Sequence, residues 1–140
     1  MSYVNPEITQ ADTSVRQFSA QLSATRRGAR LARLLATEQL RSWGLPFESA
    51  AHVVAELAAN AALHGHVPGR DFRLTLTAAE GILRIEVTDT RGDRLPVSRQ
   101  PGDSESGRGL ILVDAFADRW GVTPGPLPCK TVWAEFDLTP

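Results

Sequence analysis

Two runs of alternating apolar and polar residues, joined by a short turn, constrain the fold of this chain most strongly. The first run covers residues 72–77, the second covers residues 82–89, and Ala79, Glu80 and Gly81 lie between them. A period of two is typical of half-buried strands, and so short a connection joins antiparallel neighbours. The sequence therefore predicts a β-hairpin in the middle of the chain, with one of its faces on a core.

Two helical patterns precede the hairpin. The first covers residues 25–42 and begins after Ser23 or Thr25, either of which can cap it. Its apolar stripe consists of four leucines: Leu31, Leu34, Leu35 and Leu40. The second runs from about Phe47 to His64 and is rich in alanine, a strong helix former.

Shorter patterns complete the chain. They are a short strand, a polar stretch rich in Gly and Pro, a helix opened by glycines, and two final strands: residues 14–22, 91–106, 107–116, 120–122 and 131–138. Hairpin-linked strands with separately gathered helices favour the α+β class. We therefore expect a two-layer sandwich, in which about three helices cover one face of a mixed, mainly antiparallel sheet.

Length and composition narrow the function classes. The 140 residues suit one domain, which we place at residues 13–140 after a loose tail at residues 1–12. A net charge of −1 argues against a nucleic-acid protein that works by bulk charge, although a small anion needs only a local site. Cys129 is the only cysteine, so an internal disulfide is excluded. Without a signal peptide or an apolar run of about 18–20 residues, we expect a cytoplasmic protein with no membrane contact.

Three motifs contain chemically useful groups. In the second helix, Glu56, Asn60 and His64 are spaced by four residues and so share one face. A carboxylate there can act as a general base, and an amide oxygen suits Mg²⁺, but a plain solvated face has the same pattern.

The second motif follows the hairpin, where Asp89 ends the strand and Gly92 comes three residues later. An aspartate there can accept a hydrogen bond from an exocyclic amine, and glycine allows a ligand to approach the backbone. An ordinary Asx turn is the alternative explanation.

The third motif is Ser106-Gly107-Arg108-Gly109-Leu110 before a helical pattern. Free N–H groups at a helix N-terminus attract anions, whereas the bland alternative is a loop-to-helix junction.

Together, in this order, the motifs resemble the GHKL (Bergerat-type) ATPase domain of histidine kinases, gyrase and anti-sigma factor kinases. Residues 56–65 resemble its N-box, Glu-Leu-Ala-Ala-Asn-Ala-Ala-Leu-His-Gly. Residues 89–92 resemble its first glycine box, residues 106–110 its second, and residues 93–106 its ATP lid. The short length and the Glu-x-x-x-Asn form are most similar to the anti-sigma factor serine/threonine kinase branch, and to small ATP-binding regulators of actinomycetes.

The resemblance implies a role for each matching residue. Glu56 is the implied general base, Asn60 the implied ligand of Mg²⁺, and Asp89 the implied acceptor for the adenine amino group. Further ATP contacts are implied for His64, Gly92, Gly107, Arg108, Gly109, Leu110 and Thr131, with Thr131 supporting Asp89 directly or through water.

The chain also departs from the family pattern. Arg91 and Asp93 occupy the two later glycine positions of the first box, and Glu105 stands where an arginine is common. Cys129-Lys130 replaces the glycine expected before Thr131.

The resemblance implies an Mg-ATP-dependent regulator that sequesters a sigma factor and phosphorylates an anti-anti-sigma antagonist, with ATP and Mg²⁺ as cofactors and no direct nucleic-acid contact. Homodimers are common in this branch. Two alternatives stay open: a non-catalytic ATP-binding switch, and a degenerate member that acts only through protein contacts.

Overall fold

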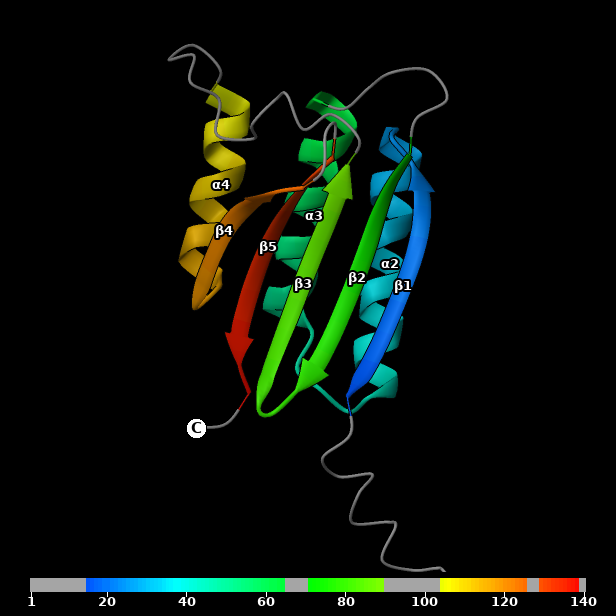
Figure 1. Ribbon diagram of the computed structural model, residues 1–140, viewed down its shortest axis with the longest axis vertical. Helices are drawn as coiled ribbons and strands as arrows, with labels where there is room; N and C mark the ends of the chain where they lie inside the picture. The colour runs from blue at the N-terminus through cyan, green and yellow to red at the C-terminus, as the bar shows by residue number, and fades with distance from the viewer. Residues whose placement is uncertain (1–14, 65–70, 90–103, 126–128, 139–140) are drawn as a thin grey trace, which may run out of the picture.

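The computed structural model describes residues 15–64, 71–89, 104–125 and 129–138, with the backbone alone described at residues 63–64 and 104–109. Along these ranges one strand is followed by two helices, a strand hairpin, a third helix and two final strands (Figure 1). The elements are β1 (Arg16–Ser23), α2 (Arg26–Ser42), α3 (Glu48–His64), β2 (Asp71–Ala79), β3 (Ile82–Asp89), α4 (Ser104–Phe116), β4 (Arg119–Pro124) and β5 (Lys130–Asp137).

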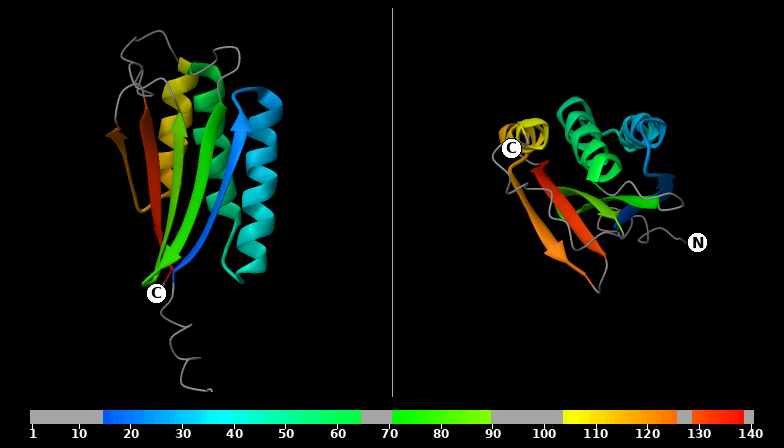
Figure 2. Two further views of the ribbon diagram at one scale, coloured as in Figure 1. Left: turned by 45° about the vertical axis from the view of Figure 1, so that its right-hand side comes forward. Right: turned by 90° about the horizontal axis from the view of Figure 1, so that it is seen from above.

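The described strands form one sheet with the order β1-β2-β3-β5-β4. The helices α2, α3 and α4 stand side by side on one face of it, which confirms the predicted two-layer α+β sandwich (Figure 2). The expectation of a mixed sheet was wrong, because all four described pairings are antiparallel. A pair of helices reverses the chain between β1 and β2. The single helix α4 links β3 to β4, but β5 lies between these two strands and is antiparallel to both.

The central hairpin is confirmed. Its core face is built from alternate apolar side chains, all of them buried: Phe72, Leu74 and Leu76 in β2, and Leu83, Ile85 and Val87 in β3. Ala79 pairs with Ile82, which leaves Glu80 and Gly81 as a two-residue turn with φ values of 55° and 77°. Positive φ at both central residues is the type I′ geometry, which matches the right-handed twist of the strands.

The buried face of α2 differs from the predicted leucine stripe. Its buried residues follow a spacing of four: Gly28, Ala32, Ala36 and Leu40. Leu31 and Leu34 are instead 43% and 55% exposed. Of the predicted stripe, Leu40 is fully buried and Leu35 packs partly buried against the core. Because α2 packs against α3, small side chains on the buried row let the two helices approach closely.

The first turn of α2 is held by a cap and by one glycine. Of the two predicted caps, Thr25 is the one used, and its Oγ1 accepts a hydrogen bond of 3.0 Å from the Gly28 N–H. A Cβ atom at Gly28 would lie 1.9 Å from the backbone carbonyl oxygen of Ser23. Only glycine fits there without moving the chain.

We therefore expect Gly28→Ala to lower the free energy of unfolding by about 1–3 kcal/mol, the usual cost of overpacking. Helix propensity alone predicts the opposite sign, because alanine is favoured over glycine by about 1 kcal/mol inside a helix. Urea unfolding measures the difference. The control is Gly44→Ala, where φ is 74° but no atom lies within 4 Å of the added Cβ, so only the backbone term of about 1–2 kcal/mol applies. A Gly28→Ala protein as stable as the wild type contradicts the clash.

Candidate functional site

The C-terminal half of α3 meets the end of β3 and the start of β5 in a small cavity, which we call the α3–β3–β5 pocket. Its volume is about 10 Å³. Its lining combines apolar and polar side chains: Leu57, Asn60, Ala61, Val87, Asp89, Lys130 and Val132. The structure thus brings Asn60 and Asp89, predicted from separate motifs, to one place.

Asp89 reaches this pocket because of the strand period. Leu83, Ile85 and Val87 occupy the core-facing positions of β3, and Asp89 is the next residue on that face. It is only 6% exposed. A carboxylate taken out of water is costly unless it is paired or hydrogen-bonded, so its surroundings must compensate for its charge.

Lys130 supplies that compensation. It is the cross-strand partner of Asp89, and its Nζ lies 3.0 Å from Oδ2 and 3.3 Å from Oδ1 of the carboxylate. The two side chains are 2% and 8% exposed, so the ion pair is buried. Sequence reasoning noted Lys130 only as a departure from the family pattern. The signal that could have found it is the alternation of β5, which places Lys130, Val132 and Ala134 on one face.

Thr131 lies next to Lys130 in β5 and pairs with Thr88 of β3. Successive residues of a strand face opposite sides of the sheet, so Thr131 and Lys130 point in opposite directions. Thr131 pairs with Thr88, and their Oγ1 atoms lie 2.7 Å apart. The residue of β5 that pairs with Asp89 is therefore Lys130, and the support of Asp89 by Thr131 stays a prediction.

Glu56, Asn60 and His64 all lie in α3, as the spacing predicts. Glu56 and Asn60 are half-buried, one helical turn apart on the same side, whereas only the backbone of His64 is described. The predicted shared face is therefore confirmed for Glu56 and Asn60. The functional roles of Glu56, Asn60 and His64 stay predictions.

The second glycine box lies inside α4. This helix begins at Ser104, so residues 104–106 of the predicted lid form its first turn, and residues 93–103 and Gly92 lie outside the described residues. The N–H groups that lack an intrahelical partner are those of the N-cap and of the first three helical residues, so in this helix they end at Ser106, and Gly107, Arg108, Gly109 and Leu110 lie beyond them. Leu110 is 7% exposed and packs as an interior residue.

The donor chemistry fits a metal–nucleotide complex better than a free-standing metal centre. Within the described ranges, no three His, Cys, Asp or Glu side chains gather as metal ligands do. Mg²⁺ takes few protein oxygens and otherwise water and phosphate oxygens, and the Asn60 amide oxygen is the pocket group that could hold such an ion beside a nucleotide. The purine base of a nucleotide fits the pocket less well, because the cavity has room for about one water molecule.

The opposite face of the sheet contains a separate charged network. Glu135 accepts hydrogen bonds from Arg84 (2.8 Å) and Arg119 (3.0 Å), and Arg84 also lies 4.5 Å from the ring centre of Trp133. The hydrogen bonds from Arg119 and Arg84 hold the pKa of the Glu135 carboxyl below its ordinary value. The sheet separates this network from the pocket, so we assign it to the stability of the sheet.

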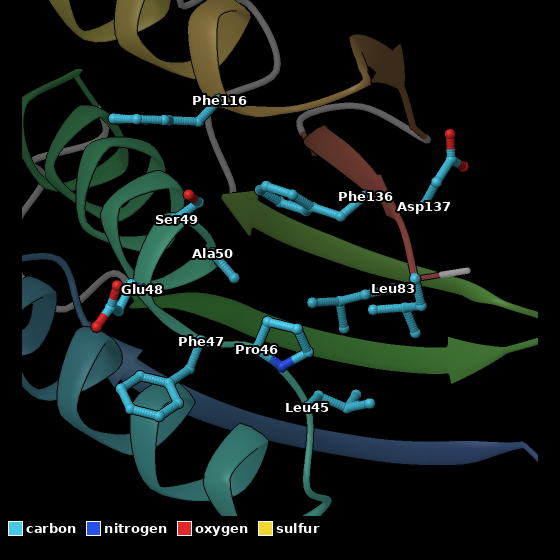
Figure 3. A pocket seen from close by; sticks show the side chains of 11 residues that line it. Leu45, Pro46, Phe47, Glu48, Ser49, Ala50, Leu83, Phe116, Phe136 and Asp137 are labelled. Carbon is cyan, nitrogen blue, oxygen red and sulfur yellow. The ribbon is translucent and has the colours of Figure 1, made fainter. Parts of the chain in front are cut away.

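A larger cavity of about 460 Å³ lies near the other end of β3 (Figure 3). Pro46, Leu83 and Phe136 are among its lining residues and come from the segment before α3, from β3 and from β5. Leu83 and Asp89 are six residues apart on one strand, which corresponds to about 20 Å. This cavity is therefore distinct from the α3–β3–β5 pocket.

The chain is similar to known proteins in its family pattern and in its fold. The family model described as histidine kinase-like ATPase domain matches residues 22–136. The fold is similar to the crystal structure of the RsbU and RsbW domains of Rv1364c from Mycobacterium tuberculosis, with a TM-score of 0.68 and 22% identity. That likeness covers 89% of this chain and 33% of the other, so this chain spans about a third of that protein's length. No curated protein was found to match, and no helix in the described ranges is long and apolar enough to cross a membrane. On the family match over most of its length, the chain belongs to the histidine kinase-like ATPase domain family.

Proposed function

We propose that this chain is a cytoplasmic regulator that binds Mg-ATP at the α3–β3–β5 pocket and controls a partner protein by sequestration and phosphorylation. The observation that carries the proposal is the meeting of Asn60 and Asp89 in one pocket. Family membership supports it, and the likeness to a structure that contains an RsbW domain is consistent with it. The partners follow from the resemblance to anti-sigma factor kinases: a sigma factor is bound, and an anti-anti-sigma antagonist is phosphorylated.

Each residue has a specific task in this proposal. The Asp89 carboxylate accepts a hydrogen bond from the adenine amino group, and Gly92 lets the base approach the backbone. Asn60 holds Mg²⁺, which neutralises charge on the phosphate oxygens. The N-terminus of α4 faces the phosphates with its free N–H groups and its dipole, Gly107 leaves room for their approach, and Arg108 adds a positive charge.

Glu56 is the proposed general base. It lies one turn before Asn60 on α3, so a nucleophile close to a phosphate held near Asn60 is also close to Glu56. Its carboxylate takes the proton from the attacking hydroxyl group of the antagonist, or from water.

A non-catalytic or degenerate member is the second candidate. The buried ion pair and the 10 Å³ cavity favour it, because the Asp89 oxygens are already engaged. Binding of ATP without phosphoryl transfer selects the switch, whereas no binding at all selects action through protein contacts alone.

Thermal unfolding in the presence of nucleotide tests the binding proposal. A ligand at about one hundred times its Kd stabilises the folded state by about 2.7 kcal/mol, so ATP with Mg²⁺ should raise the Tm. We expect Asn60→Ala to remove the additional effect of Mg²⁺ and to keep the smaller effect of ATP alone. Asn60→Asp, which keeps an oxygen ligand, is the control and should retain the Mg²⁺ effect. An equal Tm shift for wild type and Asn60→Ala with Mg²⁺ present contradicts the assignment.

A further inference from the structure

We infer that Lys130 is the residue that sets base affinity and selectivity at this site, because its ammonium group occupies the acceptor that adenine needs. The inference rests on the proposed function of Asp89 as the base acceptor. The Lys130 ammonium group is a competitor within the chain itself, and ATP must displace it from Asp89.

The geometry makes this competition direct. Lys130 Nζ contacts both carboxylate oxygens of Asp89, at 3.0 and 3.3 Å, and is itself an N–H donor like the adenine amino group. The ion pair lies in a cavity with room for about one water molecule, so a purine reaches Asp89 only if the lysine side chain moves.

Burial makes the competition strong. Both side chains are less than a tenth exposed, so water screens their attraction little. Breaking the pair leaves two charges to be compensated, and ATP compensates only the carboxylate. The lysine must therefore leave the pocket for solvent or for the phosphate groups when the base enters.

The same pair also affects which base is preferred. Asp89 as a pure acceptor selects for adenine, which has an amino group where guanine has a carbonyl oxygen. With the ammonium group on the carboxylate, that selection is suppressed. Removal of Lys130 should therefore increase the preference for ATP over GTP.

The test compares ATP and GTP affinities of the wild type, Lys130→Ala and Lys130→Arg by calorimetry, each with Mg²⁺. The free energy of a hydrogen bond to a charged group corresponds to about a tenfold to hundredfold change in affinity. We expect Lys130→Ala to bind ATP tighter by about that factor, with GTP affinity unchanged. Lys130→Arg, which keeps the positive charge, should behave as the wild type does.

Loss of Lys130 leaves Asp89 buried without its cation, so the alanine variant needs a check by circular dichroism. If it is unfolded, Lys130→Gln carries the test, since its neutral amide still donates to Asp89 but competes less strongly. ATP affinity equal to or weaker than that of the wild type in a folded variant overturns the inference and leaves the proposed function standing. No ATP binding by either the wild type or a folded variant overturns both.

Discussion

Glu56→Gln should slow phosphoryl transfer by about 10²–10⁴-fold, the usual contribution of a general base. Glutamine has nearly the same shape and hydrogen-bonding reach as glutamate but does not take up the proton. The position is half-buried in the middle of α3, so the neutral side chain is also tolerated in the fold. Mg-ATP affinity should stay close to that of the wild type, because Glu56 is assigned to the nucleophile and not to the nucleotide.

Release of inorganic phosphate from γ-labelled ATP, with water as the nucleophile, measures this without a purified partner. Transfer to an anti-anti-sigma antagonist is the fuller assay. Glu48→Gln is the matched control, since Glu48 is an exposed carboxylate in the first turn of the same helix and should be dispensable. An unchanged rate in Glu56→Gln shows that the base lies elsewhere.

Asp89→Ala should weaken ATP binding and lower the free energy of unfolding. Loss of a hydrogen bond to a charged acceptor corresponds to about tenfold to a hundredfold weaker ATP binding. Lys130, only 2% exposed, is left as a buried cation without its carboxylate, and breaking a buried pair costs about 3–5 kcal/mol. Calorimetric titration with ATP and urea unfolding measure the two effects separately.

The double variant Asp89→Leu/Lys130→Met separates them further. Two apolar residues of similar volume can replace a buried ion pair without loss of stability. We therefore expect near wild-type unfolding together with lost ATP binding. ATP binding by this stable variant at wild-type affinity contradicts the role given to Asp89.

The central hairpin and α3 were predictable from local signals. A period of two with Glu80-Gly81 at the turn specifies antiparallel strands, and the alanine-rich run up to His64 specifies a helix. The place of Asp89 was predictable for the same reason, because the alternating run of residues 82–89 shows that this residue ends the strand.

The features that were missed depend on non-local packing. The leucines of α2 have a regular apolar pattern, yet the buried row combines Gly28, Ala32 and Ala36 with Leu40, while Leu31 and Leu34 are exposed. The insertion of β5 between β3 and β4 is a pairing across the whole fold, and it alone places Lys130 opposite Asp89. The helix α4 begins at Ser104, three residues before the predicted start at residue 107. Its first residues, Ser104-Glu105-Ser106, have no apolar periodicity that would indicate a helix.

Calorimetric titration of the wild-type protein with ATP, with and without Mg²⁺, tests the central claim most directly. The claim is that Asn60 and Asp89 form one Mg-ATP site. It predicts saturable binding of one ATP per chain that tightens with Mg²⁺ and is lost in the folded Asp89→Leu/Lys130→Met variant. Absence of binding by the wild type up to millimolar ATP, with Mg²⁺ present, contradicts it.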